Sequence, residues 1–189
     1  MRLKSPRIAP LTDAELSPDQ KAAVASVSEG RPLLNIFRTL VRGPKALTAF
    51  LAWGGYILSR RNDLPPRERE IVILRIGYLC RSGYEWTQHK RIGLAVGLTE
   101  AEIEAIKTGA GAPNWSEADR ALIRAADDLN RDHFVSDAVW ADLTRHFTEK
   151  QCMDVVFTAG QYTQVSMMLN SFGVQLDEGQ VLDPDLKAY

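Results

Sequence analysis

A glutamate and a histidine four residues apart, Glu85 and His89, are the side chains in this sequence that best fit acid/base chemistry. Residues four apart share one face of a helix, and this face continues through Ile92 and Gly93, so it is predicted to point inward. A carboxylate beside an imidazole can orient or tune a group that moves protons near neutral pH. The pair also has a structural reading, in which Glu85 is the N3 partner of Ser82 in a capping box.

A third candidate, Glu70, lies in the apolar segment that precedes this pair. The pattern predicts a helix from Pro65 to about Leu79 that is apolar almost all round. Such a helix is buried, either in the domain core or between subunits. Glu70 and Arg75 therefore need partners there, or their ionisation will be perturbed.

Helix-start signals recur along the rest of the chain, and no alternating strand pattern competes with them. Capping patterns begin at Ser17, Ser82, Thr99, Ser116 and Thr148. We therefore expect an all-α fold of eight or so helices in one compact domain over residues 11–178. Extended tails are expected at 1–10 and 179–189, and the clearest internal loop at 108–115.

Composition narrows the possible functions. The 189 residues are 45% hydrophobic and 25% charged, which suits one domain with a full-sized core. The net charge of −1 does not indicate a nucleic-acid partner. The apolar stretches are too short and too often interrupted to span a membrane. Without an apolar secretory segment at the start, a cytoplasmic protein is expected. No clustered Cys/His pattern predicts a metal site.

The spacing of Glu70, Ser82, Glu85 and His89 resembles the carboxymuconolactone decarboxylase and alkylhydroperoxidase D family. That family's peroxidase branch reads Glu-x11-Cys-x2-Cys-x3-His, so Ser82 and Glu85 stand here at the two cysteine positions. Three sequence words extend the resemblance over about residues 35–176: LLNIFRTL at 33–40, YEWTQH at 84–89 and LNSFGV at 169–174. The second word is typical of a branch without the cysteine pair.

The two departures from the peroxidase pattern change the chemistry. Ser82 forms no disulfide and Glu85 moves protons but not electrons, so disulfide peroxidase chemistry is excluded at these positions. The resemblance then implies a cofactor-independent enzyme that decarboxylates or isomerises a small unsaturated or lactone carboxylic acid from aromatic catabolism. Both reactions pass through an enolate-like species. His89 would be the main general acid/base, with Glu85 and Glu70 orienting it or relaying protons.

Substrate binding is expected to involve both a cation and apolar walls. An arginine can grip a carboxylate bidentately, and Arg38, Arg75 and Arg81 are candidates. Aromatic side chains can wall a small pocket, although they are more often plain core. The predicted substrate-binding set is Ser82, Tyr84, Trp86, Arg38 and Tyr56.

Two alternative functions and an assembly remain open at this stage. Cys80 and Cys152 are interpreted as core thiols, but a residual thiol peroxidase that uses Cys80 is an alternative. A non-catalytic helical assembly that binds a small molecule is another. The resemblance implies a homo-oligomer, a trimer or hexamer, in which the helix carrying Glu70 and the stretch 165–169 are candidate contact surfaces.

Overall fold

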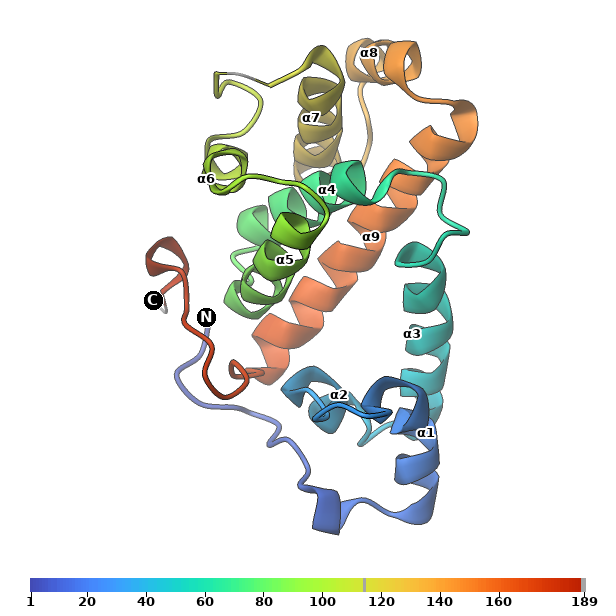
Figure 1. Cartoon of the computed structure of the whole chain (residues 1–189), viewed down its shortest axis with the longest axis vertical. Helices are drawn as coiled ribbons and strands as arrows, with labels where there is room; N and C mark the ends of the chain where they lie inside the picture. The colour runs from blue at the N-terminus through green and yellow to red at the C-terminus, as the bar shows by residue number, and fades with distance from the viewer. Residues whose placement is uncertain (114, 188–189) are drawn as a thin grey trace.

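The computed structural model describes residues 1–113 and 115–187. All regular secondary structure within these residues is helical, which confirms the expected all-α class (Figure 1). The α-helices are α1 (Pro18–Ser28), α2 (Asn35–Leu40), α3 (Pro44–Ile57), α4 (Pro66–Leu79), α5 (Gly83–Ala95), α6 (Glu100–Thr108), α7 (Glu117–Asp132), α8 (Asp137–His146) and α9 (Glu149–Phe172); the short 3-10 turns are η1 (Asp13–Glu15) and η2 (Pro184–Leu186). The expected loop at 108–115 includes residue 114, and the expected C-terminal tail includes 188 and 189, which lie outside the described residues.

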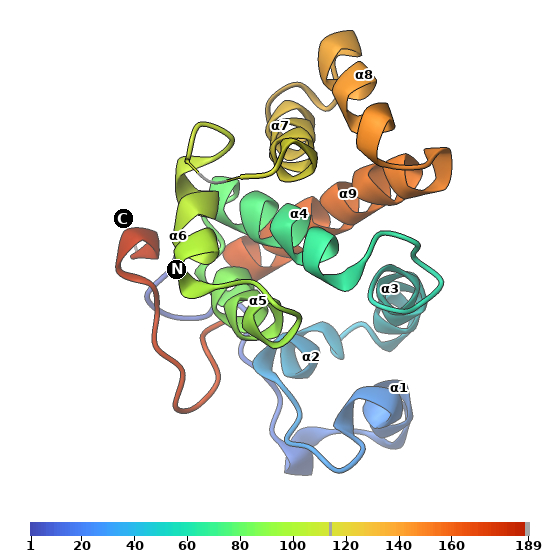
Figure 2. The same cartoon turned by 45° about the horizontal axis from the view of Figure 1, so that its top comes forward.

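Helix α4 is the centre of the main core. It packs against α5, α6, α7 and α9, and Figure 2 shows it in the middle of the molecule between α5 and α7. Neighbouring helices cover every side of α4, so residues 71–74 and Ile76 are fully buried. The apolar pattern of this helix is therefore satisfied within the domain.

The charged residue Arg75 on α4 has the partners that its burial requires. Its Nε donates to Asp127 at 2.6 Å, and its Nη1 donates to the carbonyls of Ile106 at 2.8 Å and Lys107 at 3.0 Å. These contacts tie α4 to α6 and α7. They also commit a predicted carboxylate-binding arginine to a structural role.

Side-chain caps form at most of the predicted helix starts. A hydroxyl accepts a hydrogen bond from the N3 backbone N–H at Ser17, Thr99, Ser116 and Thr148. Ser82 is the N-cap residue of α5, but its buried hydroxyl makes no hydrogen bond with any described residue. The predicted Ser82–Glu85 capping box is wrong, because the Glu85 side chain turns away from the helix start to bond His89.

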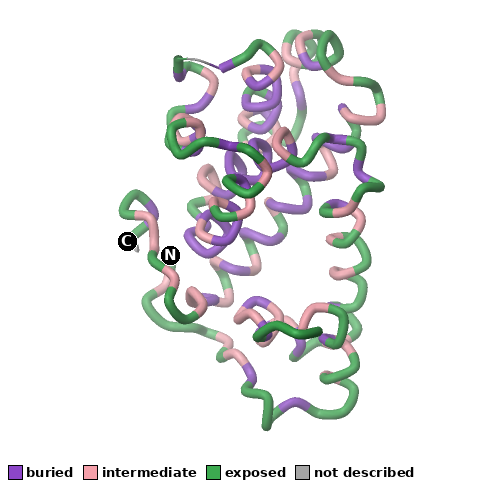
Figure 3. The backbone as a smooth tube through the Cα atoms, in the orientation of Figure 1, coloured by how far each residue is buried: buried purple, intermediate pink, exposed green. Residues whose placement is uncertain are grey.

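Helices α1, α2 and α3 form a smaller unit with its own apolar core; in Figure 1, α1 and α2 lie at the lower end and α3 runs upward from them on the right. That core consists of Leu11, Leu16, Val24, Leu33, Val41 and Leu47. A third cluster links this unit to the rest of the molecule through Ile36 on α2, Tyr84 on α5 and Val165 on α9. Buried residues concentrate in the main core and become sparse toward α1 and α3 (Figure 3).

The C-terminal segment after α9 crosses α5 and fastens it to α2. The Asp177 carboxylate accepts hydrogen bonds from the backbone N–H of Asn35, the hydroxyl of Tyr84 and the amide of Gln88, each at 2.7 Å. Further along, Leu186 in η2 is buried in the main core. Within the described residues, no helix combines the length and apolarity that crossing a membrane would need.

Candidate active site

The fold brings Glu70, Glu85 and His89 into direct contact. The Nδ1 atom of His89 lies 2.6 Å from Glu70 on α4, and its Nε2 atom lies 2.9 Å from Glu85 one turn earlier on α5. The exposed fraction of the side chain is 7% for His89, 2% for Glu70 and 5% for Glu85. The imidazole is thus held at both nitrogens in a nearly dry site, with its ring plane fixed by two helices.

The electrostatics of this group favour a protonated histidine. Burial alone lowers the pKa of His89, because it disfavours the charged ring. The negative charges of Glu70 and Glu85, together with their hydrogen bonds, outweigh burial and raise the pKa of His89 to about 10. With a proton on each nitrogen, the ring donates to both carboxylates at neutral pH.

The same geometry does not form a metal-binding set. The two carboxylates lie on opposite edges of one imidazole, so the three side chains do not converge on a common point. Among the described residues, no group of three His, Cys, Asp or Glu side chains is placed to hold a metal ion.

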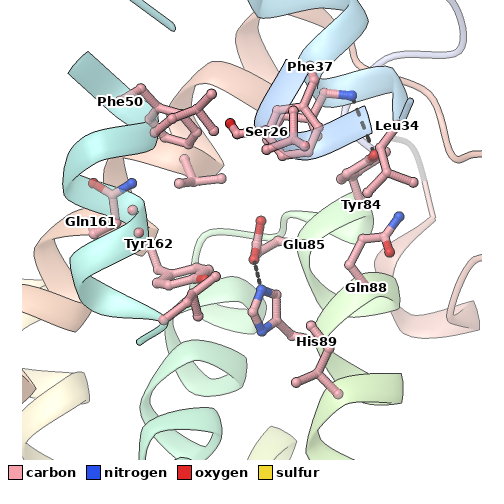
Figure 4. Close-up of a pocket in the computed structure, with 18 of the residues that line it drawn as sticks. Ser26, Leu34, Phe37, Phe50, Tyr84, Glu85, Gln88, His89, Gln161 and Tyr162 are labelled. Atoms are coloured by element: carbon pink, nitrogen blue, oxygen red, sulfur yellow. Dashed lines mark hydrogen bonds and ion pairs between the residues drawn. The ribbon is translucent and has the colours of Figure 1, made fainter. Parts of the chain in front are cut away.

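A cavity of about 470 Å³ opens directly beside this group (Figure 4). Its walls come from the end of α1 and the loop after it, α2, α3, α5 and α9. The apolar lining residues are Val27, Leu34, Ile36, Phe37, Phe50, Leu51, Leu58, Ile92 and Val165, and the polar ones are Ser26, Arg31, Tyr84, Glu85, Gln88, His89, Arg91, Gln161 and Tyr162. This size and mostly apolar wall suit a small organic molecule.

Glu85 and His89 both line the cavity, and Glu85 carries the carboxylate that is directed into it. Figure 4 shows its carboxylate between His89 and the open space, with one oxygen bonded to the ring and the other directed into the cavity. Glu70 lies behind His89 and is not among the lining residues. The Tyr162 ring meets His89 edge-on at a centroid distance of 4.9 Å and closes the side of the site.

Of the predicted substrate-binding residues, Tyr84 lines the cavity and the other four do not. Arg38 donates to the carbonyls of Leu33 at 2.9 Å and Leu11 at 3.0 Å, and pairs with Asp13 at 2.7 Å. Arg38 therefore anchors the loop before α2. These contacts use the Nε and Nη1 donors of its guanidinium, and Arg38 is not among the residues that line the cavity.

Ser82, Trp86 and Tyr56 also lie away from the cavity wall. Ser82 is fully buried at the start of α5. Trp86 belongs to the main core, and its indole N–H donates to Asp183 at 3.1 Å. The Tyr56 hydroxyl donates to Asp154 at 2.6 Å, so it joins α3 to α9.

Most of the cavity lining was not predicted from the sequence, and its polar residues Arg31, Arg91 and Gln161 are among those missed. Arg31 and Arg91 are exposed residues at the cavity wall, and no hydrogen bond or ion pair joins their side chains to other described residues. Gln161 is 4% exposed on α9, and its side-chain oxygen has no hydrogen-bond partner among residues 1–113 and 115–187. A glutamine at an inward position of an apolar helix was the available signal for Gln161. Arg31 lies in a loop without any periodicity, and nothing in the sequence marked it.

The two cysteines lie outside this site. Cys152 is fully buried in the main core, and Cys80 ends α4, where it packs against that core. Burial raises the pKa of both thiols, which disfavours the reactive thiolate. Both environments agree with their interpretation as core thiols.

Residues 44–128, which contain Glu70, Glu85 and His89, match the carboxymuconolactone decarboxylase family. No curated protein matches the sequence. Among solved structures, an uncharacterized peroxidase-related protein from Ralstonia eutropha JMP134 with an alkylhydroperoxidase AhpD core is similar at 20% identity and a TM-score of 0.77, covering 90% of this chain and 93% of that one.

Two further solved structures share the fold. An uncharacterized peroxidase-related protein from Silicibacter sp. TM1040 is 15% identical with a TM-score of 0.76, covering 93% of this chain and 95% of that one. A variant of the debrominase Bmp8 in which a cysteine is replaced by alanine, in complex with 2,3,4-tribromopyrrole, is 13% identical with a TM-score of 0.75. The match covers 93% of this chain and 94% of that one. The family match and the shared helical architecture lead to one conclusion: residues 44–128 resemble the carboxymuconolactone decarboxylase family, and the chain has an alkylhydroperoxidase D-like fold.

Proposed function

We propose that the protein is a cofactor-independent proton-transfer enzyme that decarboxylates or isomerises a small unsaturated or lactone carboxylic acid, of the kind formed in aromatic catabolism. One observation carries the proposal: a buried carboxylate–imidazole–carboxylate group presents a single free carboxylate oxygen, that of Glu85, to a mostly apolar cavity. This group has proton donors and acceptors but no electron-transfer partner.

In an isomerisation, Glu85 takes a proton from a carbon next to a carbonyl group of the substrate. The electron pair of the broken C–H bond moves to the carbonyl oxygen and forms an enolate. Glu85 then returns the proton to a different carbon, so the double bond has moved. The His89 imidazolium donates a hydrogen bond to Glu85 throughout and offsets its negative charge, while Glu70 holds the ring in place.

In a decarboxylation, the C–C bond to the departing carboxylate breaks and carbon dioxide leaves. The electron pair again becomes an enolate, which must gain a proton at carbon. The proton shared by His89 and Glu85 is transferred to that carbon, and solvent then replaces it. Because the pKa of His89 is raised, the imidazole carries this proton at neutral pH.

The substrate carboxylate requires a cation, and the two arginines of the cavity meet that need better than Arg38. Arg31 and Arg91 have no competing acidic partner among the described residues. On α5, Arg91 lies three residues after Gln88, so the two share a helix face that adjoins the face of Glu85 and His89. A carboxylate held by Arg31 and Arg91 would leave the apolar body of the substrate against α3 and α9.

The test is a turnover screen of metal-stripped protein with carboxylated muconolactones and unsaturated ring-cleavage acids in deuterated water. We expect one carbon of a substrate to gain deuterium, as read by proton NMR, and the product mass to separate decarboxylation from isomerisation. Glu85→Gln and His89→Gln should each slow the reaction by about 10²–10⁴-fold. Glu178→Gln, an exposed residue away from the cavity, controls for the lost charge. A folded Glu85→Gln protein with full activity would contradict the assignment.

A further inference from the structure

Gln161 is a buried polar residue that the mechanism above does not use. It lies on α9 with two other buried polar residues, Asp154 and Thr158, at helical spacing. Asp154 accepts from the Tyr56 hydroxyl and from the backbone N–H of Asp63, and Thr158 accepts from an asparagine amide at 3.3 Å. Gln161, one turn further along, makes no side-chain hydrogen bond with the described residues and is the member of the three that lines the cavity.

The oxygen and the nitrogen of the Gln161 amide face different surroundings. Its oxygen is enclosed without a partner, whereas Figure 4 shows its nitrogen on the side that faces the cavity. Gly54 on α3, which also lines the cavity, lies beside this nitrogen, since a Cβ atom at that position would be 3.7 Å from it. The amide is therefore held between two helices with a free N–H donor toward the cavity. An amide N–H without a partner among the described residues is available to donate to an acceptor atom of a ligand in the cavity.

Gln161 and Glu85 point into the same space from different walls (Figure 4). The residue next to Gln161 is Tyr162, whose ring contacts His89, so the amide is anchored beside the proton-transfer group. Hydrogen-bond donors placed where negative charge develops are a major source of rate acceleration in enolate chemistry.

We propose that the Gln161 amide N–H donates a hydrogen bond to a ketone or lactone carbonyl oxygen of the substrate, which makes Gln161 the residue that selects oxo acids over their carbonyl-free analogues. When Glu85 removes the neighbouring proton, the electron pair moves onto that oxygen, and the hydrogen bond from Gln161 strengthens. This inference rests on the proposed site at Glu85, but its test does not require turnover.

The experiment compares two probes that differ in one carbonyl group: 4-oxo-4-phenylbutanoate and 4-phenylbutanoate. Titration calorimetry on the wild-type protein should give about tenfold tighter binding of the oxo acid, which corresponds to one satisfied hydrogen bond. Gln161→Leu should abolish this ratio while leaving the affinity for 4-phenylbutanoate unchanged. Gln164→Leu makes the same chemical change at an exposed position of α9 and should keep the ratio.

Thermal unfolding separates a ligand role from a structural role. Because Gln161 has no internal partner to lose, Gln161→Leu should be as stable as wild type or more so. Equal wild-type affinity for both probes, or binding of neither, would overturn the proposal, as would a ratio that survives in Gln161→Leu. If no acid in the turnover screen exchanges deuterium but the ratio depends on Gln161, the proposed reaction fails while the carbonyl-binding role stands.

Discussion

His89 is held between two carboxylates, and this arrangement determines how its charge responds to pH. Glu70 and Glu85 raise the pKa of the ring to about 10, against about 6.5 for a histidine in an unfolded chain. Between these two values the folded protein keeps a proton that the unfolded chain has released. Folding stability therefore depends on pH in a range where few other groups titrate.

The doubly paired His89 should make the protein less stable at alkaline pH. The contribution of His89 is fully present below about pH 6.5, declines as pH rises and is lost above about pH 10. Across this window it should fall by about 1.4 kcal/mol per pH unit. Urea unfolding at several pH values, with His89→Gln as the reference, measures the difference in slope.

A second variant checks the cause of that slope. Glu70→Gln removes one of the two charges that raise the pKa of His89, so the loss of stability should be complete at a lower pH than in wild type. An unchanged pH dependence in both His89→Gln and Glu70→Gln would show that His89 is neutral in the folded protein.

The sequence predicted part of this site because part of it follows helical spacing. The contact between Glu85 and His89 follows from their positions four apart on one helix, and an apolar helix explains why Glu70 needs a partner. The cap at Ser82 failed because the same Glu85 side chain had two competing partners, and spacing does not rank them. Arg31 and Gln161 reach the cavity only because the tertiary fold places the loop after α1 and helix α9 around the same space as α5, which a local pattern does not contain.

At the scale of elements, α3 supplies a cavity wall with two adjacent glycines, Gly54 and Gly55. A Cβ atom at Gly55 would meet nothing within 4 Å, so its absence leaves open space rather than a close backbone contact. Gly55 lies inside a regular helix, where glycine is less favourable than alanine. The position therefore contributes room for a ligand at some cost to helix stability.

Substitutions at Gly55 should separate the stability of α3 from the space available to a ligand. Gly55→Ala should stabilise the protein by about 0.5–1 kcal/mol, because the helix gains propensity without a clash. Gly55→Leu should fold equally well but fill part of the cavity and weaken binding of 4-phenylbutanoate by at least about tenfold. Chemical denaturation and titration calorimetry provide the two readouts. Normal ligand affinity in a folded Gly55→Leu protein would place the ligand elsewhere.

The helix boundaries show why element types were easier to predict than element roles. Pro65, Pro66 and the following apolar residues indicated α4, and capping hydroxyls marked most other starts. Periodicity did not decide whether the apolar surface of α4 faces its own domain or another subunit. The packing of α5, α6, α7 and α9 around α4 gives the answer: the domain itself covers it.

At the scale of the whole molecule, the cavity lies where two separately packed parts meet. The α1–α3 unit has its own core, and α5 and α9 belong to the larger body. Sites at such junctions are common, since each part can keep its packing while the space between them accepts a ligand. The solved structures with this fold include proteins described as peroxidase-related and a debrominase, so the architecture alone does not determine the reaction.

We further propose that the protein is a homo-oligomer, a trimer or hexamer, although α4 is no longer a candidate contact surface. Large apolar side chains are exposed elsewhere, including Met167 at 59%, Leu58 at 47% and Trp53 at 41%. Light scattering at micromolar concentration should give three or six times the chain mass of 21.1 kDa. Met167→Glu should shift the mass toward the monomer if α9 forms the contact, and a monomeric wild type would contradict the assembly.

The Asp177 carboxylate, which joins Asn35, Tyr84 and Gln88, also has a consequence for the order of events during synthesis. The cavity wall on α2 and α5 is fastened by a residue that lies 142 positions after Asn35 and 93 after Tyr84. Contacts over such separations form late, because a long loop must close first. On the ribosome, Glu70, Glu85 and His89 on α4 and α5 are translated well before residue 177. This wall of the cavity is therefore fastened only after residue 177 has been translated.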